Sequence, residues 1–170
     1  IGRFLDSLPD PALDRTTVFV VSDHGFLPSR REIRPNVRLR KLGGQRLARF
    51  VMNHGAGTLY RLDADAAAVD QLAREIATME GVSGMWTPAD YDALGLPAPG
   101  DHHQVADVMF EAAPGYSYGD AADGDEEHGA PKYLGTHGQR PLYGDNAAFF
   151  LAAGAGVRRG MPLGAIRSRD

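Results

Sequence analysis

The feature that most constrains this chain is an apolar run, Thr16 to Ser22, that ends abruptly in Asp23, His24 and Gly25. A continuous run of β-branched and apolar residues predicts a strand covered on both faces, as in a largely parallel sheet. Burying a carboxylate or an imidazole without a partner costs several kcal/mol. We therefore expect a bound group that stabilises both side chains. The alternative is a strand-to-turn junction in which the Asp23 carboxylate accepts backbone hydrogen bonds.

The order of the expected elements is that of an α/β fold. A helical pattern opens the chain, and the clearest helix is "DADAAAVDQLAREIATMEG", with Asp63 or Asp65 as N-cap and Gly81 as its stop. A short helix is expected in "TPADYDALG". Further strands are expected at 47–53, 58–62, 82–86 and 147–152 and in "DVMFEAAPG". The basic segment 30–46 is predicted to be irregular, and strands 16–22 and 147–152 should lie inside a mostly parallel sheet.

Composition narrows the classes of partner. The net charge is −4, whereas proteins that bind nucleic acid usually carry a basic surface. A nucleic acid duplex is therefore not expected as a partner. No apolar run is long enough to span a membrane. The absence of cysteine excludes disulfides and thiolate metal sites, and it leaves cytoplasm and periplasm equally open. The chain opens in the middle of a helical pattern, so we expect a fragment of a longer protein.

A second candidate site lies in "YLGTHGQRPLYGDN", where His137 stands between Gly135 and Gly138. Glycines on both sides let the backbone come close and aim the imidazole into a cleft. Carboxylate and imidazole together suit zinc or another divalent first-row metal. Asp23, His24 and His137 are therefore the candidate metal ligands.

The other histidines have simpler interpretations. His102 and His103 lie in a polar loop and are expected to be solvent-exposed, and His54 is expected in a Gly-rich hairpin turn. The segment "GDAADGDEEHG", residues 119–129, superficially resembles a calcium loop. It lacks the regular ligand spacing of such loops, so we expect a solvated loop.

In combination and order, "SDHG", "DVMFEAAPGYSY" and "GTHG…DN" resemble the alkaline phosphatase superfamily. The likeness is closest to type I phosphodiesterases and nucleotide pyrophosphatases, with phosphonoacetate hydrolases as near relatives. The resemblance implies a mostly parallel sheet flanked by helices, a two-metal site, usually with zinc, and small phosphate-ester substrates. Asp23 and His24 would hold the metal that activates the nucleophile, and His137 would hold the second metal.

The resemblance also implies an organisation. Residues 1–34 and 100–170 would be core segments that carry the two metal motifs, and residues 35–99 would be a cap-like α+β insertion. The nucleophile and the remaining ligands would precede residue 1, so no catalytic nucleophile is assigned. Gln139 stands where the family usually has an aromatic residue. The open alternatives are hydrolysis of phosphonates, phosphomonoesters or sulfate esters, and a non-catalytic domain with this fold.

Overall fold

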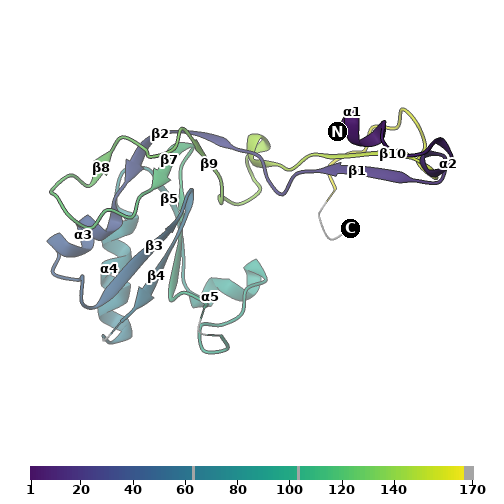
Figure 1. Ribbon diagram of the computed structural model, residues 1–170. Helices are drawn as coiled ribbons and strands as arrows, with labels where there is room; N and C mark the ends of the chain where they lie inside the picture. The colour runs from purple at the N-terminus through teal and green to yellow at the C-terminus, as the bar shows by residue number, and fades with distance from the viewer. Residues whose placement is uncertain (63, 103, 167–170) are drawn as a thin grey trace. The chain divides into compact units, whose positions relative to one another are not determined.

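The computed structural model describes residues 1–62, 64–102 and 104–166. The chain divides into two compact units, one made of Ile1–His24 with Ala148–Asp170 and the other of Gly25–Ala147. Helices and strands occur in both units (Figure 1). The expected α/β class is therefore confirmed as a mixed fold of helices and sheets. In the described part of the chain, no helix is long and apolar enough to cross a membrane.

The first unit is built on a two-stranded antiparallel ribbon. Strand β1 (Thr17–Val21) pairs with β10 (Phe150–Gly154) in a register that runs from Thr17 opposite Gly154 to Val21 opposite Phe150. Two four-residue helices, α1 (Gly2–Leu5) and α2 (Asp10–Leu13), precede β1. The strand predicted at 16–22 is thus confirmed to within one residue at each end.

The parallel arrangement expected for these two strands is not confirmed. The β1–β10 pair is antiparallel, and Phe19 and Val21 are each 60% exposed, so neither strand lies in a sheet interior. Among the described residues, the one parallel pair is β2 (Leu27–Ile33) with β7 (Gly115–Tyr118). An apolar run indicates how much of a strand must be covered, but it specifies neither the direction of the neighbouring strand nor its identity.

The second unit contains two four-stranded sheets. In one, β2 pairs with β7 and also, antiparallel, with β8 (His128–Gly129) and β9 (Gly135–Thr136). The other is antiparallel in the order β3 (Ala48–Asn53), β4 (Ala56–Arg61), β6 (Val108–Ala112), β5 (Val82–Trp86). The expected hairpin and the expected strand 82–86 are therefore confirmed. The 3-10 turn η2 (Gly144–Asn146) is the last element of this unit in the sequence.

The strongest helical pattern forms α4 (Ala66–Ala77), which packs against strands β4 and β5 of the antiparallel sheet (Figure 1). Asp65 is the N-cap, and its side chain accepts a hydrogen bond from the Ala68 N–H at 2.7 Å. The other suggested cap, Asp63, lies outside the described residues. The predicted short helix is α5 (Pro88–Tyr91), which continues into η1 (Asp92–Leu94).

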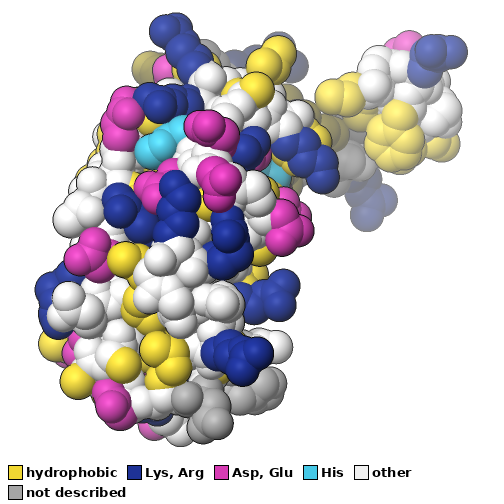
Figure 2. Space-filling model, turned by 90° about the vertical axis from the view of Figure 1, so that its left-hand side faces the viewer, with side chains coloured by type: hydrophobic (Ala, Val, Ile, Leu, Met, Phe, Trp, Pro, Cys, Tyr) yellow, Lys and Arg dark blue, Asp and Glu magenta, His cyan; other side chains and the backbone are white. Residues whose placement is uncertain are grey.

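The basic segment 30–46 is not irregular, as was expected. It contains the end of β2 and a helix, α3 (Pro35–Lys41), which buries Val37 and Leu39. Its basic side chains pair with acids of the 119–129 loop, since Arg38 and Lys41 lie 3.2 and 3.3 Å from the Glu127 carboxylate. Figure 2 shows basic and acidic side chains interspersed on the face of this unit that carries α3. The sequence pattern missed α3 because charge concealed a short apolar face.

Aromatic rings fill the core of the second unit. Phe50 is 2% exposed, and its ring centroid lies 5.6 Å from that of Phe110 and 4.9 Å from that of Tyr118. Gly57 leaves room for the Phe50 ring, because a Cβ atom at this position would overlap it. This cluster packs with the apolar face of α4 and holds the antiparallel sheet in place.

We expect the chain to lose stability at alkaline pH, because two of its tyrosines are buried. Burial raises the pKa of Tyr91 to about 12, and burial also raises the pKa of Tyr118. Above pH about 10 the unfolded chain releases these protons first, so the free energy of unfolding should fall by about 1.4 kcal/mol per pH unit for each tyrosine. Urea titrations between pH 8 and 12 would measure this slope. The variants Tyr91→Phe and Tyr118→Phe should each reduce it, and an unchanged slope in both would contradict the assignment.

At neutral pH the two variants should differ. The Tyr91 hydroxyl donates a hydrogen bond to the Ala106 carbonyl at 2.9 Å, so Tyr91→Phe should cost about 1 kcal/mol. The Tyr118 hydroxyl has no hydrogen-bond partner among the residues that the structure describes. Removing a buried hydroxyl without a partner should leave stability unchanged or raise it.

Candidate functional site

The first candidate pair, Asp23 and His24, lies directly after β1 in the first unit. The His24 backbone N–H donates to the Asp23 carboxylate at 2.9 Å, and the His24 Nε2 atom lies 3.5 Å from the other Asp23 oxygen. The Asp23 side chain is 86% exposed, so water or a ligand can reach it. Carboxylate and imidazole are therefore close enough to face one cation. The backbone hydrogen bond is also the one expected of a strand-to-turn junction, so this pair alone does not distinguish the two interpretations.

His137 lies in the second unit, just after β9. Its carbonyl accepts a hydrogen bond from the Gly55 N–H at 2.6 Å. Its imidazole contacts the Phe26 ring edge-on, with centroids 5.6 Å apart. A second imidazole, that of His54, lies against it with centroids 4.5 Å apart and an interplanar angle of 32°.

His54 is a neighbour of His137 that the sequence interpretation did not single out. It lies in the β3–β4 turn, as expected, but its φ of 55° is in the left-handed region, and its ring faces His137. The two histidines are far apart in the chain, and nothing in the "NHGAG" turn pattern points to this contact. A long-range pairing of this kind depends on how the turn packs, which local patterns do not report.

The loop after His137 is fixed by buried polar groups. The Glu111 carboxylate accepts hydrogen bonds from the Arg140 side chain at 2.7 Å and from the Arg140 backbone N–H at 3.3 Å. The Asn146 amide donates to the Gln139 carbonyl at 2.9 Å. Gln139 is only 5% exposed and packs against Gly55. His137 therefore projects from a well-held segment.

An apolar pocket of about 190 Å³ lies beside this loop. The Arg140 guanidinium lies 4.3 Å from the centroid of the Trp86 ring at the pocket wall. A cavity on the order of 150 Å³ holds one benzene molecule, so this pocket has room for about one ring. The remaining walls come from β4, β6, the η1 segment and the loop, with Ala56, Leu94, Leu96, Met109, Phe110, Glu111 and Gly138.

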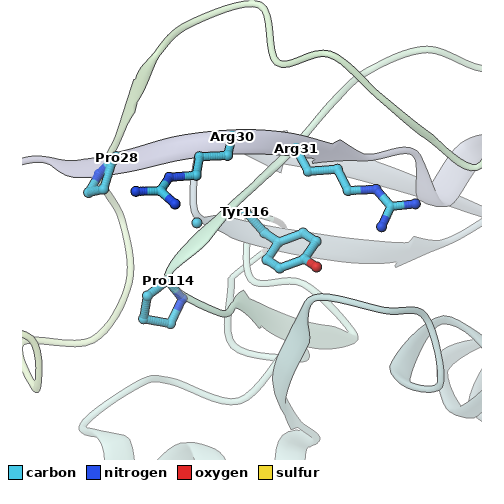
Figure 3. A pocket seen from close by; sticks show the side chains of 6 residues that line it. Pro28, Arg30, Arg31, Pro114 and Tyr116 are labelled. Atoms are coloured by element: carbon cyan, nitrogen blue, oxygen red, sulfur yellow. The ribbon is translucent and has the colours of Figure 1, made fainter.

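A larger groove of about 510 Å³ lies along β2 and β7 (Figure 3). A bulge in β2 between Ser29 and Arg31 leaves both Arg30 and Arg31 exposed beside Tyr116. The Glu80 carboxylate accepts hydrogen bonds from Tyr116 and Arg31, both at 2.7 Å, which lowers its pKa. Among the described residues, those that line the groove are Pro, Arg, Gly and Tyr, so its chemistry differs from that of the His137 region.

The donor types at both histidine sites fit a divalent first-row metal, and zinc in particular. Within residues 1–62, 64–102 and 104–166, however, no group of three or more His, Cys, Asp or Glu side chains is placed to hold a metal. The structure shows two pairs, Asp23 with His24 and His54 with His137. These pairs belong to different units, so it stays a prediction that Asp23, His24 and His137 share one two-metal site, as the resemblance implies.

The polar-loop histidines differ in what the structure describes. His102 is exposed, and its Nδ1 atom accepts a hydrogen bond from the Gln104 N–H at 3.2 Å. Exposure was expected for it. His103 lies outside the described residues.

Residues 1–140 match the family described as type I phosphodiesterase / nucleotide pyrophosphatase. The chain belongs to this family. The matched range contains both the "SDHG" and the "GTHG" motif, so the resemblance that these motifs indicated is confirmed. No curated protein matches the chain significantly.

Two solved structures share the fold of this phosphodiesterase-family chain. Human ectonucleotide pyrophosphatase / phosphodiesterase 5 is 15% identical, with a TM-score of 0.64 over 91% of this chain. Phosphonoacetate hydrolase from Sinorhizobium meliloti 1021, in complex with phosphonoacetate, is 18% identical, with a TM-score of 0.56 over 81% of this chain. The chain spans little more than a third of these structures, 38% and 36% of their lengths.

Proposed function

We propose that this chain is the C-terminal part of a metal-dependent phosphodiesterase or nucleotide pyrophosphatase that hydrolyses small phosphate esters. The family match, which covers both histidine motifs, is the observation that carries this proposal. The nucleophile would then precede residue 1, and residues 35–99 would form the cap between core segments 1–34 and 100–170.

The resemblance to this family implies the roles of the residues. Paired zinc ions, when bound, would supply positive charge for the oxygens of the ester. Asp23 and His24 would hold one ion with their adjacent carboxylate and imidazole. His137 would hold the second, from a loop that Glu111 and Asn146 keep in place. The pocket at Trp86 would receive the organic group of the ester. This pocket is apolar, and one of its lining residues is Gly138, the neighbour of His137 in the chain.

A second candidate is hydrolysis of a phosphonate, in which a P–C bond is cleaved instead of a P–O bond. The similarity to a phosphonoacetate hydrolase favours it. Assaying the full-length protein with bis(4-nitrophenyl) phosphate and with phosphonoacetate, each with added zinc, separates the two. Turnover of the diester alone supports the phosphodiesterase proposal, turnover of phosphonoacetate alone supports the second, and turnover of neither contradicts both.

The chain of 170 residues by itself is expected to be catalytically silent and to bind zinc only weakly. Zinc sites normally have at least three protein ligands, and the proposed ligand set supplies two for one ion and one for the other. Calorimetric titration of zinc and a diester assay test this expectation. Nanomolar zinc affinity, or measurable turnover, would show that the chain carries a complete site.

A further inference from the structure

We propose that His54 supplies a second imidazole to the metal ion that His137 holds. This inference rests on the proposed function, since it adds a ligand to the second metal of that site. His54 comes from the β3–β4 turn, in the segment expected to be a cap, so the cap would contribute directly to metal binding.

The distance between the two rings fits a shared ion. Zinc binds an imidazole nitrogen at 2.0–2.1 Å, and the ring centroid lies about 1.1 Å further out, so two imidazoles at 90–110° around one ion have centroids about 4.5–5.2 Å apart. The His54 and His137 centroids are 4.5 Å apart. The centroid distance is therefore compatible with two imidazoles in adjacent coordination positions of one ion.

The backbone of both residues is held where the pair forms. The His54 carbonyl accepts a hydrogen bond from the Tyr118 N–H at 2.7 Å, and the His137 carbonyl accepts one from the Gly55 N–H at 2.6 Å. These bonds tie the β3–β4 turn to the loop after β9 and to β7. Both imidazoles thus project from fixed backbone, which a metal site requires of its ligands.

The conformation of His54 gives an independent argument. Among the described residues, His54 is the one non-glycine residue with a positive φ, which is 55°. Glycine would be less strained in this conformation. Strained backbone of this kind is concentrated at functional sites, and a metal ligand is a function that would require the side chain.

The alternative is that the two rings only pack against each other, with the Tyr133 ring centroid 5.9 Å from that of His54. Ring packing would give stability without metal binding. The two explanations differ most clearly for His54→Gly, which removes the imidazole and also relieves the positive φ. If His54 is a ligand, this variant should lose zinc affinity while its denaturation midpoint stays the same or rises.

The test uses the full chain with Asp23→Ala and His24→Ala in place, so that one candidate pair remains. Calorimetry should show one zinc ion bound in the micromolar range. His54→Gly and His137→Ala should each weaken it at least tenfold, and the exposed His102→Ala control should stay within twofold. With Cu²⁺ as the probe, electron paramagnetic resonance should show two equivalent imidazole nitrogens, reduced to one in His54→Gly.

Several results would overturn the inference: no zinc binding in the starting chain, unchanged affinity in His54→Gly, or one nitrogen on copper before any change at His54. The proposed function fails differently. If the pair binds zinc but the full-length protein hydrolyses neither diester nor phosphonate, the metal pair stands and the proposed hydrolase is wrong. If His137→Ala alone weakens binding, the hydrolase proposal is untouched and His54 is not a ligand.

Discussion

Phe50→Ala is expected to lower the free energy of unfolding by about 3–5 kcal/mol, the usual cost of removing a fully buried phenyl ring. The ring contacts both Phe110 and Tyr118 at the centre of the core. The cavity cannot easily collapse, because the Asn36 side chain accepts a hydrogen bond from the Phe50 N–H at 3.0 Å and donates one to the Phe50 carbonyl at 2.9 Å. The backbone is thus held in place while the ring is lost.

Urea denaturation of the chain, followed by circular dichroism, measures this effect. Val51→Ala is the matched control, because Val51 is the next residue of β3 and is 45% exposed. It should cost less than about 1 kcal/mol, since little apolar area leaves a buried environment. A loss below about 1.5 kcal/mol for Phe50→Ala would show that the three-ring cluster is loosely packed.

Local patterns predicted the parts of the fold that local interactions determine. Helix α4 has Asp65 as its N-cap and an apolar stripe from Val69 to Ile76. Both features can be recognised from the spacing of residues within the helix itself. The β3–β4 hairpin and strand β5 also follow from residues close in sequence. In contrast, the antiparallel pairing of β1 with β10 joins segments far apart in the chain, and an apolar run carries no information on strand direction.

The candidate site shows the same division. Asp23 and His24 could be proposed because they directly follow an apolar strand and precede Gly25, and His137 could be proposed because it stands between Gly135 and Gly138. His54 could not, since its contact with His137 joins two residues that are far apart in the chain. The basic segment 30–46 was misread for a related reason. Arg38 and Arg40 pair with acids of the distant 119–129 loop. Val37 and Leu39 are buried on the apolar face of α3. Neither the pairing nor the burial can be read from the local sequence pattern.

Replacing a proposed metal ligand should have the largest effect on activity. In the full-length protein, Asp23→Ala, His24→Ala and His137→Ala are each expected to lower kcat/KM for a phosphodiester by about three orders of magnitude or more, equivalent to about 4 kcal/mol of transition-state stabilisation. Each side chain would hold an ion that stabilises charge developing on the reacting oxygens, so its loss acts on kcat. Assays with bis(4-nitrophenyl) phosphate at saturating zinc measure the change.

His102→Ala is the control, because His102 is exposed and its Nδ1 atom bonds within its own loop. It should retain activity to within about twofold, as expected for a surface substitution away from the site. Asp23→Asn sharpens the test, since the amide keeps the shape of the carboxylate and its hydrogen bond to the His24 N–H can be retained. If Asp23 serves only the strand-to-turn junction, Asp23→Asn should be nearly as active as the unaltered protein. If it holds a metal, losing the negative charge should cost about as much as Asp23→Ala, and that result would favour the metal over the junction.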